Sequence, residues 1–130
     1  MLGYVTIGVN DMDKAVQFYD GLLGEIGARQ LFGQDRIKFY GTGPGESMIA
    51  ICLPYDENAP AAGNGNMIAI PGGSREGVDK LYAKAMELGA SDEGEPGERL
   101  PVFYGAYVRD LDCLLYTSPS PRDQRGSRNR

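Results

Sequence analysis

The chain repeats its own order of strands and helices after about half its length. Two predicted helices end in "IGA" (26–28) and "LGA" (88–90), and the strands that precede these helices are "YVTI" (4–7) and "MIAI" (67–70). Both pairs are separated by nearly the same number of residues, which favours a duplication. Each half reads as a strand, a helix and two or three further strands. Because such a half cannot bury both faces of its sheet alone, we expect two halves packed side by side in one α+β domain.

The first half begins with an apolar, β-branched segment at 4–9 that predicts a buried strand. A helix follows, with Asn10 or Asp11 as its N-cap and Gly27 at its end. Its apolar stripe recurs at the three- to four-residue spacing of a helix and consists of Val16, Tyr19, Leu22 or Leu23, and Ile26. Short apolar runs between Gly, Asp and Pro predict three more strands, at 28–33, 36–43 and 47–54.

The second half follows a polar linker at 55–65. A strand is predicted at 67–71, then a helix with Ser74 as its N-cap, and then strands at 101–110 and 113–117. The apolar stripe of this helix is Val78, Leu81 or Tyr82, Ala85 and Leu88. The sequence therefore predicts a single domain at 1–116, with halves at about 1–54 and 66–116.

Three segments give the chain a resemblance to a known family. "VTIGVNDMDKAVQFYDGLLG" (5–24), "GNGNMIAI" (63–70) and "FYGAYVRDLD" (103–112) resemble the vicinal oxygen chelate superfamily of glyoxalases, bleomycin-resistance proteins and extradiol dioxygenases. The resemblance covers residues 1 to about 112. It implies tandem βαβββ modules that form a curled mixed sheet around a cavity, as in the glyoxalase/bleomycin-resistance fold. It says little about the reaction, because one fold hosts many chemistries.

The same resemblance implies three positions for the ligands of a divalent metal ion. In this chain they fall on Tyr4, on Met67 and near Thr117. A neutral phenol, a thioether and a hydroxyl are poor ligands for such an ion. The chain has no His, which excludes any His-metal, Ser-His or Cys-His mechanism within it. Cys52 and Glu46 are the other candidate ligands, and they read better as a core residue and a turn residue. We therefore predict no standard metal centre and no cofactor.

If the strands alternate regularly, several polar and aromatic side chains face the expected cavity. Such a lining suits a small aromatic or amphipathic ligand. The alternative is that they are ordinary strand residues, and Arg36 is a weaker candidate of the same kind. The predicted pocket residues are Tyr4, Thr6, Lys38, Tyr40, Met67, Phe103 and Tyr107.

Three functions remain open from the sequence. The first is a small-molecule binder without a metal. The second is a metal-dependent glyoxalase-like lyase or isomerase whose ligands are atypical or were lost with the native C-terminus. The third is an interaction module. The resemblance also implies a homodimer, while the catalytic residues stay unknown.

Charge and composition limit the classes of partner and the location that we expect for the protein. A net charge of −5 argues against a nucleic-acid surface. No apolar run approaches the roughly 20 residues that span a membrane. Two Cys make no disulfide framework, and the N-terminus lacks the pattern of a signal peptide, so we expect a cytoplasmic protein.

The C-terminal segment "CLLYTSPSPRDQRGSRNR" does not read like the end of this domain. Relatives have a Gly after the Asp-x-Asp turn, where Cys113 stands here. A Gly is expected because such a tight turn often needs positive φ. The resemblance stops abruptly at this point. We therefore interpret the sequence after Asp112 as non-native and predict that 117–130 is a disordered tail.

Overall fold

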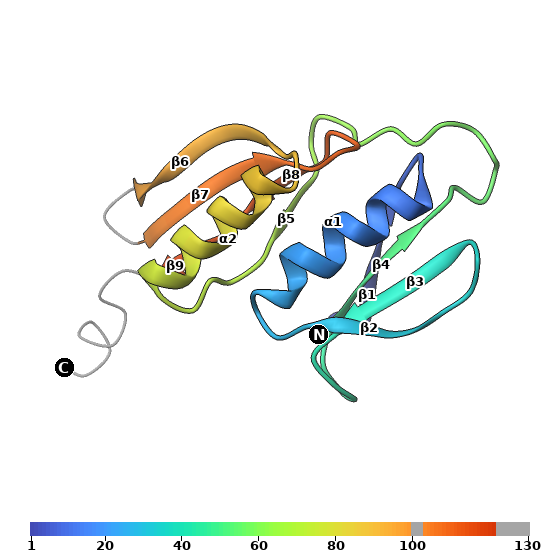
Figure 1. The fold of residues 1–130 in the computed structure, drawn as a ribbon, viewed down its shortest axis with the longest axis horizontal. Helices are drawn as coiled ribbons and strands as arrows, with labels where there is room; N and C mark the ends of the chain where they lie inside the picture. Colours follow the sequence, from blue (N-terminus) through green and yellow to red (C-terminus); the bar gives the residue numbers. More distant parts are fainter. Residues whose placement is uncertain (100–102, 122–130) are drawn as a thin grey trace.

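The first half of the chain forms one sheet with a helix across it (Figure 1). The structure is a computed structural model, and it describes residues 1–99 and 103–121. The elements of this half are β1 (Tyr4–Gly8), α1 (Met12–Gly24), β2 (Arg29–Gly33), β3 (Ile37–Gly41) and β4 (Met48–Cys52). The strand order is β1-β4-β3-β2, in which β1 and β4 are parallel and the other neighbours are antiparallel.

The second half repeats this arrangement. Its elements are β5 (Met67–Ala69), α2 (Arg75–Glu87), β6 (Ser91–Arg99), β7 (Phe103–Arg109), β8 (Leu115–Thr117) and β9 (Ser120–Pro121). The order β5-β8-β7-β6 matches that of the first sheet, again with a parallel first pair, and β9 pairs with β7. The predicted α+β fold with two βαβββ halves is confirmed. The two sheets are separate, with no strand pair joining them in the described part of the chain, so they do not close around a cavity.

Both helices begin at the caps that the sequence predicts. The Asp11 side chain accepts a hydrogen bond from the Lys14 backbone N–H at 3.1 Å, and the Ser74 hydroxyl accepts one from the Gly77 N–H at 3.0 Å. These oxygens satisfy backbone donors that the first turn of a helix leaves without partners. The buried residues of α1 are Ala15, Phe18, Tyr19, Leu22 and Leu23, and those of α2 are Val78, Leu81 and Ala85. No helix among the described residues is long and apolar enough to cross a membrane.

Two strands were not predicted, β6 and the short β9, which lies in the segment predicted as a tail. β6 has the sequence "SDEGEPGER", which lacks the apolar alternation of a half-buried strand. It lies at the edge of the second sheet, where it pairs only with β7 in the described structure. Edge strands tolerate Pro, Gly and charge, and these residues hinder pairing with other chains.

The two halves share one hydrophobic core. Residues from both sheets and both helices form a single buried cluster, from Ile7 and Phe18 in the first half to Leu81 and Tyr116 in the second. A polar contact joins the halves at the surface, where the backbone N–H and the side-chain amide of Asn10 donate to Asp112 Oδ1 at 3.0 and 2.8 Å.

The ordered chain continues beyond the predicted end of the domain. Thr117 is the last residue of β8, and Ser120–Pro121 form β9 against β7, so the boundary at 116 is too early. The strand continues because Leu114, Tyr116 and Thr117 are buried. Cys113 has a φ of 72°, the left-handed conformation for which a Gly was expected. The rest of the predicted tail, 122–130, lies outside the described residues.

Candidate functional site

The face of the first sheet that is turned away from α1 carries an exposed aromatic cluster. Tyr4 packs edge-on against Phe39, with ring centroids 5.0 Å apart, and Phe39 stacks on Phe32 at 4.6 Å. Tyr4 is 51% exposed and Phe32 is 54% exposed. Thr6 lies beside Phe39 on the same face, because both residues pair with Ala50 of β4. We call this surface the open face of the first sheet.

Lys38 and Tyr40 do not lie on this face. In β3 they alternate with Phe39, and they pair with Ile51 and Ile49, whose side chains point toward α1. Tyr40 is only 1% exposed, and its hydroxyl donates to Asp20 of α1 at 2.7 Å. Burial and this carboxylate raise the pKa of Tyr40 well above its ordinary value. The sequence pattern left the phase of β3 open, and a strand shifted by one residue presents its other side chains.

The remaining predicted pocket residues belong to the second half. In β7, Phe103 and Tyr107 alternate with Tyr104 and Val108. Tyr104 donates to Asp79 of α2 at 2.7 Å, so Phe103 and Tyr107 face away from that helix. The Arg99 guanidinium lies 5.5 Å from the centroid of the Tyr107 ring. This face is therefore a second open sheet surface.

A groove between the two halves brings two of the predicted residues together. It has a volume of about 430 Å³. Thr6 of β1 and Met67 of β5 line it, together with Asn66, which precedes β5, and Asp112 of the turn after β7. Tyr4, Phe103 and Tyr107 are not among its lining residues.

A second groove lies on the open face of the first sheet, and we call it the Arg36 groove. Its volume is about 480 Å³. The floor is made by Thr6, Gly8, Ile37 and Cys52, and the walls by Arg36 and the linker residues 54–56 and 59–61. The linker lies directly over β1, since a Cβ on Gly8 would be 2.8 Å from the Pro60 Cβ. The sequence analysis named Arg36 and Cys52 as separate candidates and did not name Tyr55. A polar linker carries no sequence signal that shows which part of the domain it packs against.

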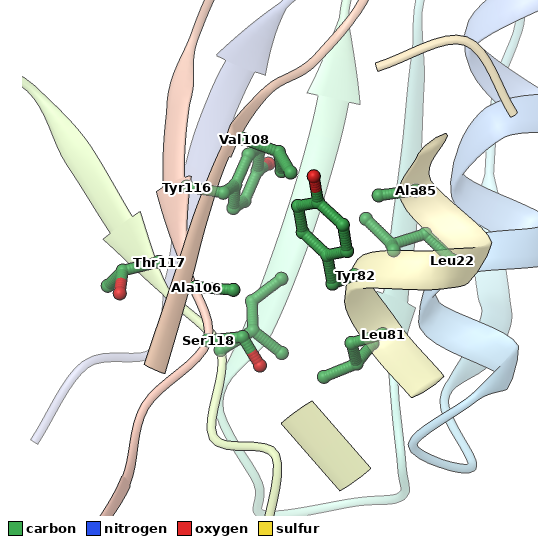
Figure 2. Close-up of a pocket in the computed structure, with 10 residues that line it drawn as sticks. Leu22, Leu81, Tyr82, Ala85, Ala106, Val108, Tyr116, Thr117 and Ser118 are labelled. Carbon is green, nitrogen blue, oxygen red and sulfur yellow. The ribbon is translucent and has the colours of Figure 1, made fainter. Parts of the chain in front are cut away.

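A small apolar cavity lies between α2 and the second sheet (Figure 2). Leu22 of α1 and Leu81 and Ala85 of α2 face Ala106 and Val108 across it. Its volume of about 20 Å³ has room for about one water molecule. This cavity is a packing gap in the core and is too small for an organic ligand.

A buried polar cluster joins α1 to the second sheet. The Tyr19 hydroxyl donates to Asp110 Oδ2 and lies 2.9 Å from the Tyr116 hydroxyl. Asp110 Oδ1 accepts from the backbone N–H groups of Asp112 and Leu114, both at 2.9 Å. Burial raises the pKa of Asp110, and its hydrogen bonds oppose this effect. Burial also raises the pKa of Tyr19 and Tyr116, so both phenols stay protonated. The cluster fixes how the halves meet.

Two helix-covered sheets of matching strand order define a two-module α+β protein. The chain belongs to the Glyoxalase/Bleomycin resistance protein/Dioxygenase superfamily, whose family model matches residues 1–112. The match ends at the residue after which the sequence resemblance stops. No curated protein sequence matches the chain.

Solved structures agree with this assignment. A glyoxalase/bleomycin resistance protein from Albidiferax ferrireducens T118 is 28% identical, with a TM-score of 0.84 over 92% of this chain and 98% of that chain. The fosfomycin resistance protein FosX from Mesorhizobium loti is 20% identical, with a TM-score of 0.72 over 98% and 97%. A glyoxalase I mutant from Zea mays is 20% identical, with a TM-score of 0.74 over 91% of this chain and 44% of that chain. The last two similarities show the fold alone.

The residues at the implied metal positions do not fit a divalent ion. Tyr4 is held against Phe39, Met67 offers only a thioether, and the Thr117 hydroxyl is buried without a hydrogen-bond partner among the described residues. No group of three or more Cys, Asp or Glu side chains that could hold a metal occurs in the described part of the chain. Cys52 is a poor substitute, because burial raises the pKa of its thiol and only the thiolate is a good ligand.

Proposed function

We propose that the chain binds a small aromatic or amphipathic molecule on the open face of the first sheet, without the standard divalent metal centre of its relatives. The exposed cluster of Tyr4, Phe32 and Phe39 is the observation that carries this proposal. Aromatic rings that already stack on one another offer a rigid apolar platform for a further ring. The adjoining Arg36 groove has a volume within the usual range for small-molecule sites.

The binding proposal is tested with a neutral fluorescent probe. N-phenylnaphthylamine should bind the protein with increased fluorescence, and Tyr4→Ala or Phe32→Ala should weaken this binding about two- to tenfold, the effect of one lost aromatic contact. Met86→Ala is the control, because Met86 is an exposed apolar residue on α2, away from this face. Equal binding by all variants would contradict the proposal.

The proposal that the chain has no standard divalent metal centre is tested separately. Purified protein should contain no stoichiometric Zn, Ni, Mn or Fe by elemental analysis, and adding these ions should leave the Tm unchanged. A stoichiometric metal whose removal lowers the Tm would overturn this part and favour the lyase or isomerase alternative.

We also propose that the chain forms a homodimer, as the resemblance implies. Tyr4, Phe32 and Met67 are all about half exposed on surfaces that lack a helix, which is consistent with a partner there. Light scattering after size exclusion should give twice the mass of the 14.1 kDa chain. A monomer at micromolar concentration would contradict this expectation.

A further inference from the structure

We propose that the ligand of this chain is an organic anion: an aromatic or apolar molecule whose acidic group binds in the Arg36 groove. This inference rests on the binding proposal above and names the chemical class of the ligand. It is carried by the position of Arg36 beside the aromatic cluster and by the hydrogen bonds that Arg36 leaves unmade.

The Arg36 groove and the aromatic cluster are neighbouring parts of one surface. The pairing of β1, β4 and β3 places Gly8, Cys52 and Ile37 in one row across the open face, and this row is part of the floor of the groove. The next row contains Thr6 and Phe39. Successive rows on one face are two residues apart, which is about 7 Å along a strand. A molecule with one or two rings can therefore contact Phe39 while its acidic group reaches the groove.

Arg36 is held in place but keeps most of its donors. Its Nη1 donates to the Leu53 carbonyl at 2.8 Å, and its guanidinium lies 5.5 Å from the centroid of the Tyr55 ring. A guanidinium has five N–H donors, and the hydrogen bonds of Arg36 within residues 1–99 and 103–121 use one of them. None of the ion pairs within the described residues involves Arg36. Asp56 also lines the groove, but its carboxylate accepts from the Asn58 backbone N–H at 3.0 Å.

The positive charge of Arg36 affects the Cys52 thiol, which is part of the floor of the groove. The Cys52 thiol lies there, and burial raises its pKa while the Arg36 charge opposes this shift. An anion in the groove would meet the same positive charge and the remaining guanidinium donors. Arginine binds carboxylates and similar planar or trigonal anions with paired, charge-assisted hydrogen bonds.

Two probes with the same ring skeleton test this inference. Anilinonaphthalene sulfonate carries an acidic group that N-phenylnaphthylamine lacks. Fluorescence titration should show that the wild-type protein binds the sulfonate about tenfold more tightly than the neutral probe, as one charge-assisted hydrogen bond would give. Arg36→Gln should remove this advantage, so that the ratio of the two affinities falls to about one, because Gln carries no charge. Arg36→Lys should restore part of it.

The matched control is Lys38→Gln. It removes the same charge two residues further along the chain, but Lys38 lies on the face of the sheet opposite to the groove, so the preference for the sulfonate should persist. An equal loss in both variants would reveal a general charge effect and overturn the inference. A preference that survives Arg36→Gln would overturn it too. If the neutral probe binds and depends on Tyr4 while the sulfonate has no advantage, the anion inference alone fails. If neither probe binds, the underlying binding proposal fails.

Discussion

Removing a single hydroxyl from the buried cluster tests how the two halves are joined. In Tyr19→Phe the ring remains in the core, where Tyr19 is 1% exposed, but both hydrogen bonds of its hydroxyl are lost. Asp110 Oδ2 then lacks its donor, although Oδ1 keeps its two backbone N–H groups. Tyr116 is only 3% exposed, and its hydroxyl loses the Tyr19 hydroxyl, its partner among the described side chains.

The size of the effect follows from these two losses. A hydrogen bond to a charged group contributes about 1.5–3 kcal/mol, and a buried polar group left without a partner costs about 1–3 kcal/mol. The two effects share one network and do not simply add. We therefore expect the free energy of unfolding to fall by about 3 kcal/mol.

Tyr40→Phe is the matched control for this substitution. Tyr40 is also 1% exposed, but its hydroxyl donates to Asp20, an exposed carboxylate that water can solvate after the change. Its loss should cost only about 0.5–1.5 kcal/mol. Urea unfolding at pH 7.5, followed by circular dichroism, measures both variants. With an m-value of about 2 kcal/mol/M, Tyr19→Phe should lower the midpoint by about 1.5 M. If both variants lose the same stability, the cluster does not join the halves as argued.

Two further predictions concern the turn after β7. Cys113→Gly should raise the free energy of unfolding by about 1 kcal/mol, because Cys113 has a φ of 72°, which Gly adopts without the cost borne by a residue with a Cβ. Cys113→Ser keeps the Cβ and should change little, so equal gains in both variants would refute the explanation. Burial raises the folded-state pKa of Asp110 above its ordinary 3.8, so the folded protein holds this proton more tightly than the unfolded chain does. The contribution of Asp110 to stability must therefore fall as pH rises from about 3.8 through the raised pKa, and urea unfolding across this range should show a fall that Asp110→Asn lacks. Parallel pH profiles would contradict this assignment.

Local signals in the sequence predicted much of the fold. The helix cap Ser74, and Asp11 as one of two candidates with Asn10, could be recognised because a side-chain acceptor before an apolar stripe has a local physical role. The repeat added the order of elements, since each half needs the other to bury its helix and sheet. β6 was missed because a polar edge strand is defined by its pairing with β7, which no local pattern reveals.

The site was less predictable because it depends on register. Tyr4, Thr6 and Met67 were predicted to line a ligand pocket, and the structure places them near the surface at the start of each half, in β1 and β5. In β3 the neighbours Lys38 and Phe39 point to opposite faces, and the sequence does not show which of them points away from α1. The pairing with β4 shows that it is Phe39. The Tyr19–Asp110 contact was also beyond sequence reasoning, because these residues are 91 positions apart.

The positions that the resemblance implies for metal ligands lie apart from the residues that hold the fold together. Tyr4 and Met67 are 51% and 47% exposed on open sheet faces, whereas the hydrophobic core lies on the helix-covered faces. Neither side chain belongs to the hydrophobic core, so replacing either one removes no core contact. The joining of the two halves rests instead on the shared core and the Tyr19, Asp110 and Tyr116 cluster. The groups that hold the fold therefore lie on the opposite side of each sheet from the open face, so substitutions on the open face, such as those that the binding proposal tests, should leave the architecture unchanged.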